Sequence, residues 1–181
     1  MNSHVSTNDL NLIKKCLLDD RMAQQEFYKQ YASKMFAICL RYSKNREDAE
    51  DILQEGFIKV YNNLKNFKAE GSLEGWVKRI MINTALLHYR KNLKYDKNTD
   101  LEAAEWETQT ADAFSALSAK ELLSLVQQLP DGYRMVFNLY ALEGYQHKEI
   151  GDMLGINEGT SKSQLARARK YLIDLIKKSE K

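Results

Sequence analysis

Apolar residues recur at intervals of three and four through long stretches of the chain, and only one of its 181 residues is proline. This spacing places apolar side chains on one face of an α-helix, whereas the alternation typical of β-strands is almost absent. No apolar run approaches the roughly 18 residues that cross a bilayer, and the N-terminus lacks the basic-then-apolar order of a signal peptide. We therefore predict an all-α protein that stays in the cytoplasm without membrane insertion.

The apolar spacing separates two groups of helices. A short helix is expected behind Thr7 or Asn8, with Leu10, Ile13 and Leu17 on its inner face, followed by helices that begin at Asp20, Arg46 and Leu73. The second group starts at a capping box, and its helices are separated by Pro130 and by two glycines. The caps we expect are Asp20, Ser72, Ser118 with Glu121, and Asn157. These helices predict two small domains, residues 1–91 and 118–181.

Residues 92–117 are expected to form an acidic linker between the domains. Six acids outnumber two lysines there, and strong apolar anchors are few. Charge is also segregated elsewhere, because 45–58 holds five acids and one arginine while 76–94 holds five cations and no acid. The net charge of +2 does not reveal this segregation of charge along the sequence. Separate acidic and basic segments suggest several separate binding surfaces.

The stretch "GYQHKEIGDMLGINEGTSKSQLARAR", residues 144–169, has the pattern of a helix-turn-helix. Ile150 and Leu154 share one face of its first helix, and Gly155 stands at the turn. In the second helix, inward apolar residues alternate with an outward polar and cationic set comprising Thr160, Ser163, Gln164, Arg167 and Lys170. Such a face suits the DNA major groove, although an ordinary helical hairpin with a solvated charged face shows the same pattern.

A second candidate surface lies on the helix after Ser72. An aromatic, an amide and two guanidiniums recur there at spacings of three, four and seven: Trp76, Arg79, Asn83 and Arg90. Unpaired bases offer faces for stacking, edges for amides and phosphates for cations, so this stripe suits single-stranded nucleic acid. The alternative is that Trp76 belongs to the core and the cations are simply solvated.

The third helix has an acidic face opposite its apolar stripe. A row of carboxylates on one exposed helix is usually a solvated face or a docking surface for a basic partner, whereas catalytic metal sites draw ligands from several elements. No catalytic sequence motif occurs, and the histidines and cysteines lack metal-ligand spacing. We therefore predict no catalytic residue, metal or cofactor, and we expect Cys16 and Cys39 to be buried thiols.

Two motifs together resemble the extracytoplasmic-function (ECF) group of bacterial sigma factors in the sigma-70 superfamily. They are "REDAEDILQEGFIKVYNNLKNF" followed by "SLEGWVKRIMINTALLHYRKN", and "LPDGYRMVFNLYALEGYQHKEIGDMLGINEGTSKSQLARARKYL". The resemblance covers residues 9–177 and implies a non-enzymatic protein that binds core RNA polymerase, directs it to promoters and helps to melt the DNA. It also implies a region 2-like first domain and a region 4-like second domain.

The resemblance assigns expected roles to the three surfaces. Residues of the third helix would dock on the coiled-coil clamp of the largest polymerase subunits, beta and beta-prime: Asp48, Asp51, Gln54, Glu55 and Phe57. The stripe of Trp76, Arg79, Asn83 and Arg90 would capture the displaced strand of the −10 element. The second domain would read the −35 element with Lys162, Ser163 and Arg167, while Thr160 and Lys170 hold phosphates.

Several residues depart from the common pattern of the group. Leu87 stands where many members have an acid, and Gln146 replaces a more usual serine or threonine cap. Ser161 and Gln164 stand where a valine and a basic residue are common, so the preferred −35 sequence cannot be inherited. An anti-sigma factor is a partner that the group implies and that no residue here identifies. The alternative function is a stand-alone helix-turn-helix regulator with a ligand-binding or dimerising first domain; a nucleic-acid enzyme using the carboxylates ranks below both.

Overall fold

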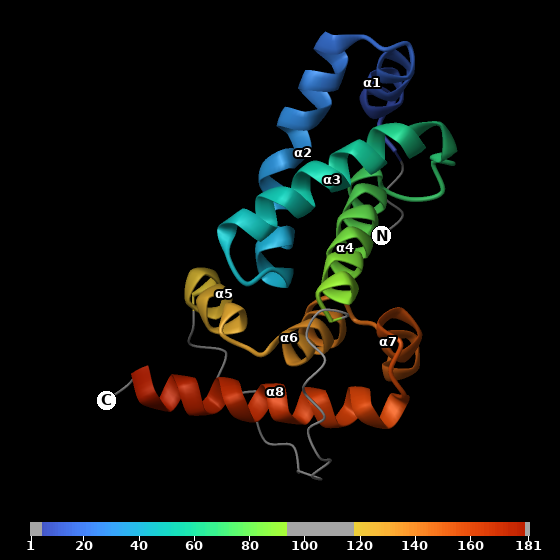
Figure 1. The fold of residues 1–181 in the computed structure, drawn as a ribbon. Coiled ribbons are helices and arrows are strands. Elements are labelled where there is room, and N and C mark those ends of the chain that lie inside the picture. The colour runs from blue at the N-terminus through green and yellow to red at the C-terminus, as the bar shows by residue number, and fades with distance from the viewer. Residues whose placement is uncertain (1–4, 94–117, 180–181) are drawn as a thin grey trace. The chain divides into compact units, whose positions relative to one another are not determined.

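The computed structural model describes residues 5–93 and 118–179, and within these ranges every regular element is a helix (Figure 1). Their contacts form two compact units. One contains the described residues up to 40 together with 45–85, and the other contains 41–44 and the described residues from 86 onward. The predicted domain boundaries remain a prediction, and the predicted linker lies almost wholly outside the described residues.

The first unit is built on one short helix, three long helices and one short turn: α1 (Thr7–Leu17), α2 (Arg21–Tyr42), α3 (Arg46–Asn63), η1 (Leu64–Asn66) and α4 (Leu73–Leu93). The last residues of α2 and of α4 belong to the second unit. In α1, α2 and α4, the side chain of an N-terminal cap accepts a hydrogen bond from a backbone N–H two or three residues further along. Asp20 Oδ1 accepts from Met22 N at 2.9 Å, and Ser72 Oγ accepts from Gly75 N at 3.0 Å, as predicted. The cap of α1 is Ser6, whose Oγ accepts from Asp9 N, so the expectation of Thr7 or Asn8 is wrong.

The inner face of α1 also differs from the prediction. Leu12, Ile13 and Cys16 are buried, whereas Leu10 and Leu17 are 38% and 47% exposed. Moving the start of the helix by one residue does not rotate its faces, so the difference arises from which side of this short helix the rest of the unit covers. The thiols of Cys16 and Cys39 are both buried, as predicted, and burial raises the pKa of Cys39 to about 12.

Aromatic rings join α2 to α3. Phe27 is fully buried, and its ring centroid lies 5.8 Å from that of Tyr61. The Tyr28 and Phe57 rings are 4.6 Å apart, and Tyr61 Oη donates to the Gln24 carbonyl at 2.8 Å. These contacts orient α3 on α2 and decide which residues of α3 remain at the surface.

A glycine allows α3 to approach α4 closely. A Cβ at Gly56 would overlap the Met81 sulfur, and both residues lie on the buried faces of their helices. One turn further along α3, Lys59 Nζ donates to Thr84 Oγ1 of α4 at 3.3 Å. Helical spacing predicts an inward face of α4 made of Val77, Ile80, Met81 and Thr84; three of these residues are fully buried, and Ile80 is half-buried.

The second unit contains α5 (Ala119–Gln127), α6 (Asp131–Phe137), the π-helical turn η2 (Asn138–Leu142), α7 (His147–Leu154) and α8 (Glu158–Ser179). Helix α8 packs against α5, α6 and α7 (Figure 1). The predicted capping box is present, since Ser118 Oγ accepts from Glu121 N and Glu121 Oε2 accepts from Ser118 N. No helix in either described range is long and apolar enough to cross a membrane.

A buried arginine, which sequence reasoning missed, closes the end of α5. Arg134 is 2% exposed, and its Nη1 donates to the carbonyls of Gln127 and Leu129 at 3.0 and 2.9 Å. The same guanidinium pairs with Asp131 in the first turn of α6. A cation that binds the last carbonyls of a helix satisfies acceptors which the helix itself leaves open.

Candidate nucleic-acid interface

The helix-turn-helix has the predicted turn. Gly155 adopts φ 72° and ψ 33°, a left-handed conformation that other L-residues rarely accept, and its N–H donates to the Gly151 carbonyl at 2.8 Å. Asn157 Oδ1 then accepts from Thr160 N at 2.6 Å and caps α8. Gln146 is the cap that precedes α7, and its N–H donates to Glu149 Oε2 at 2.7 Å. Local hydrogen bonds thus set the point at which each helix begins and ends.

The outward side of α8 carries the residues predicted to bind DNA, and we call them the α8 face: Thr160, Lys162, Ser163, Arg167 and Lys170. Lys162 and Lys170 are exposed, and the other three are half-buried. Leu165, Ala168 and Leu172, on the opposite side, are buried as predicted. One helix therefore divides into an apolar side that packs on its unit and a polar side that solvent or a ligand can reach.

An exposed ion pair moderates the charge of the α8 face. Lys162 Nζ lies 2.6 Å from Glu158 Oε1, and this hydrogen bond lowers the pKa of Glu158. Both side chains are at least half exposed, so the pair contributes little to stability and a phosphate could compete for the lysine.

Two of the departures from the family pattern turn inward. Ser161 has no exposed surface, and its Oγ lies 2.9 Å from Nδ1 of His147. Gln164 was expected on the outer side, but its amide lies against α6, where a Cβ added to Gly132 would be 3.3 Å from Gln164 Nε2. The prediction for Gln164 is therefore wrong, because α6 covers the side of α8 from which it projects.

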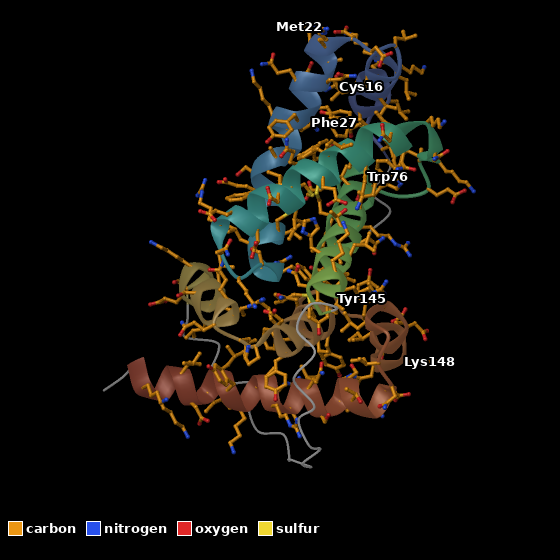
Figure 2. All side chains as sticks on the ribbon, viewed as in Figure 1. Cys16, Met22, Phe27, Trp76, Tyr145 and Lys148 are labelled. Carbon is orange, nitrogen blue, oxygen red and sulfur yellow. The ribbon has the colours of Figure 1, made fainter. Side chains whose placement is uncertain are left out.

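The four residues of the predicted stripe all lie on α4, three of them in the first compact unit. Trp76, Arg79 and Asn83 follow one another along α4, and the latter two are exposed. Trp76 lies on the first turn of α4 (Figure 2) and is half-buried, with its ring 5.4 Å from that of Phe67. Part of its side chain is therefore packed against the protein, and part is accessible to solvent. Arg90 belongs to the second compact unit, where its guanidinium donates to the Met153 carbonyl. We call Trp76, Arg79 and Asn83 the α4 stripe.

The acidic side of α3 keeps four of its five predicted residues near the surface, and we call them the α3 face: Asp48, Asp51, Gln54 and Glu55. Asp51 and Gln54 are exposed. Glu55 is half-buried and paired with Lys59 at 2.7 Å. Phe57 is 3% exposed and packs on Tyr28, so its assignment to this surface is corrected: it is a core residue.

Sequence reasoning missed an apolar member of this region. Ile58 is 55% exposed and stands four residues after Gln54, so the two share one side of α3. Its exposure could have been inferred from the sequence, because Ile58 stands outside the apolar stripe of α3.

No metal centre gathers in the parts of the chain that the structure describes. Among residues 5–93 and 118–179, no three histidine, cysteine or acidic side chains converge in a way that could hold an ion.

Comparison with known proteins relates the chain to one family. The family model described as Sigma-70 region 2 matches residues 27–94, and the model Sigma-70, region 4 matches residues 119–172. Over 173 residues the chain is 34% identical to the ECF RNA polymerase sigma factor SigW of Bacillus subtilis, which covers 88% of this chain and 92% of that protein. It is 28% identical over 176 residues to the RNA polymerase sigma-H factor of Pseudomonas aeruginosa, 91% of each chain.

A longer relative and a solved structure extend the comparison. The chain is 30% identical over 158 residues to the ECF RNA polymerase sigma factor SigE of Mycolicibacterium smegmatis and spans 61% of that protein's length. The fold resembles that of the sigma factor RpoE, solved with the anti-sigma factor NepR from Bartonella quintana, with a TM-score of 0.51 and 21% identity. That alignment covers 84% of this chain and 96% of RpoE.

Proposed function

Because the chain belongs to the ECF group of the sigma-70 family, we propose that it binds core RNA polymerase, directs it to promoters and helps to open the DNA. The observation that carries this function is the presence of both region 2 and region 4, in that order, in a chain similar to SigW over nearly its whole length. A stand-alone helix-turn-helix regulator is not favoured, because nothing in that function requires region 2.

The α8 face would read the −35 element as intact duplex. Its cations can bind phosphates, and Ser163 and Arg167 project from the side of a helix that a major groove can accommodate. The exposed Lys162–Glu158 pair would exchange for a phosphate contact on binding.

The α4 stripe would hold the −10 element as a separated strand. Stacking on one aromatic side chain is worth about 1–3 kcal/mol per base. Part of the Trp76 side chain is accessible for stacking, and its contact with the Phe67 ring holds it in position. Asn83 and Arg79 are exposed along the same helix and offer an amide and a cation to base edges and phosphates.

The α3 face, together with Ile58, would dock on the polymerase clamp formed by beta and beta-prime. The protein would perform no turnover of its own, since RNA synthesis belongs to the polymerase, and it would act in the bacterial cytoplasm where promoters are found. The sigma factor RpoE, which has a similar fold, was solved with the anti-sigma factor NepR, so such a partner is a further expectation.

Two experiments test the function. In gel filtration with purified core polymerase, the chain should co-elute as one copy, whereas a regulator would form a dimer and bind duplex DNA alone. Run-off transcription from a library of genomic fragments should then start at a defined set of promoters. Failure to associate with the polymerase, or initiation at no promoter, would refute the proposal.

A pair of variants tests the α8 face. Arg167→Ala should weaken recognition of the −35 element by about 1–3 kcal/mol, the usual loss for one base contact. Lys177→Ala removes an exposed cation near the other end of α8 and serves as the control. Equal weakening by Arg167→Ala on promoter and random DNA would contradict a base-reading role.

A further inference from the structure

One polar contact joins the two helices of the helix-turn-helix. His147 is the first residue of α7, and its Nδ1 lies 2.9 Å from Ser161 Oγ in the first turn of α8. Because Ser161 has no exposed surface, its hydroxyl is enclosed between the helices. A buried hydroxyl is costly without a hydrogen bond, so this contact favours one arrangement of α7 and α8.

A tyrosine of the π-turn supports the same histidine. The Tyr140 ring in η2 stacks on the His147 ring with centroids 4.5 Å apart and planes 19° apart. The guanidinium carbon of Arg169, two turns beyond Ser161 on α8, lies 5.8 Å from the Tyr140 centroid. Tyr140 therefore contacts α8 as well as α7 and fixes the plane of the imidazole. Figure 2 labels the next residue of α7, Lys148.

Ser161 lies among residues of the α8 face. Thr160, Lys162 and Ser163 lie within two residues of it, so any rotation of α8 about its axis that lengthens the contact with His147 also displaces their side chains. Hydrogen bonds to base edges tolerate only a few tenths of an ångström in length. Base reading should therefore depend on the orientation that this contact sets.

We propose that His147 is a positioning residue for promoter recognition: through the hydrogen bond to Ser161 it fixes the orientation in which α8 presents its outer face to the −35 element. The proposal rests on the proposed function of that face. Ser161 stands where valine is common in the family, and a chain with valine at this position would lack the contact, since valine has no hydroxyl.

Burial, with the charges around it, lowers the pKa of His147, so the imidazole is neutral near pH 7. Partial burial and then Lys162 lower its pKa, Glu158 opposes them, and Arg169 lowers it further. These three charged groups all lie on α8, and η2 contributes Tyr140. A neutral imidazole can pair with a hydroxyl in either tautomer, so the contact persists at physiological pH.

The test uses holoenzyme reconstituted from the full chain and core polymerase. Transcription is measured on a promoter found in the run-off experiment and on the same fragment with its −35 element replaced, and the ratio of the two is the discrimination. The variants are His147→Phe, which keeps a ring for stacking, Ser161→Ala, and the double variant. His147→Asn places an amide near the position of Nδ1, and Asp152→Asn, an exposed change on α7, is the control.

Both single variants should reduce discrimination by about 2- to 10-fold, as expected for one hydrogen bond, and the double variant should reduce it no further. His147→Asn should recover part of the loss, and Asp152→Asn should match the wild type. Transcription from the fragment without the −35 element should stay unchanged, which a general loss of folding would not allow.

Unchanged discrimination in both single variants would overturn the proposal. So would a loss that is additive in the double variant, or a loss accompanied by faster amide hydrogen exchange throughout α5–α8. If the wild-type holoenzyme shows no discrimination at all, the −35 role of the α8 face has failed, and this inference fails with it.

Discussion

Replacing Phe57 with alanine separates a core role from a polymerase-binding role at one position of α3. The side chain is 3% exposed and contacts the rings of Tyr28 and Tyr61 at centroid distances of 4.6 and 6.3 Å. A buried phenylalanine reduced to alanine costs about 3–5 kcal/mol, a figure that already includes the lost ring contacts and the cavity. Gln54→Ala, one turn earlier and exposed, should change stability by less than about 0.5 kcal/mol.

These magnitudes predict opposite outcomes for the two variants. For a unit of this size, 1 kcal/mol shifts the melting temperature by about 4–8 °C, so Phe57→Ala should lower it by at least about 12 °C. Gln54→Ala should leave it nearly unchanged but weaken binding to core polymerase. Hydrogen exchange of α1–α4 gives the stability of the first unit, and a titration with labelled core polymerase gives the affinity.

The affinity is measured at low temperature, where exchange shows that the first unit of Phe57→Ala is still folded. Under that condition Phe57→Ala should bind polymerase nearly as the wild type does. If the folded Phe57→Ala protein binds more weakly than Gln54→Ala, the side chain reaches the partner and its assignment to the core is incorrect.

Three further predictions concern single residues. Arg134→Met should destabilise the second unit by about 3–5 kcal/mol, because Asp131 and two carbonyls at the end of α5 lose their charged donor; exchange should speed up in α5–α8 only, and unchanged protection would contradict this. Gly56→Ala should cost about 1–3 kcal/mol through overlap with Met81, and Met81→Val in the same chain should cost less than the sum of the two single changes in urea unfolding. Because the pKa of His147 is lowered, the unfolded chain binds more protons than the folded chain just below pH 6.5, so the second unit should lose stability as the pH falls below 6.5; His147→Phe should flatten that part of the profile, and an identical profile would exclude the histidine.

Helix boundaries were the most predictable part of the structure. Asp20, Ser72 and Asn157 cap their helices as the sequence indicated, because a cap depends on a side chain and on backbone groups two or three residues away. The same locality explains the left-handed glycine at the turn, Gly155, and the apolar side of α8.

Features that depend on distant packing could not be predicted from the sequence. Phe57 is an exception, because it stands four residues after Leu53 on the same side of α3; helical spacing alone places it in the core, and only the resemblance assigned it to the surface. Arg134 resembles any other surface cation until the end of α5 is placed above it. Ser161 stands four residues before Leu165 and falls on the buried side of α8, whereas Gln164 lies at the edge of the polar side and only the packing of α6 shows that its amide turns inward. The helical period of 3.6 residues gives the direction in which each side chain points. It does not give how much of the helix circumference the neighbouring helices bury.

The π-turn of η2 constrains the length of the segment that contains it. A π-helical turn holds more residues than an α-helical one, so deleting one residue between 138 and 142 would favour a regular α-helix. Every later residue would then shift by about 1.5 Å and rotate by about 100°, which would break the register between Tyr140 and the imidazole that it stacks on. Substitution at an exposed site such as Ala141 leaves that register intact. Insertions and deletions in homologous chains should accordingly avoid this short segment even where its residues vary.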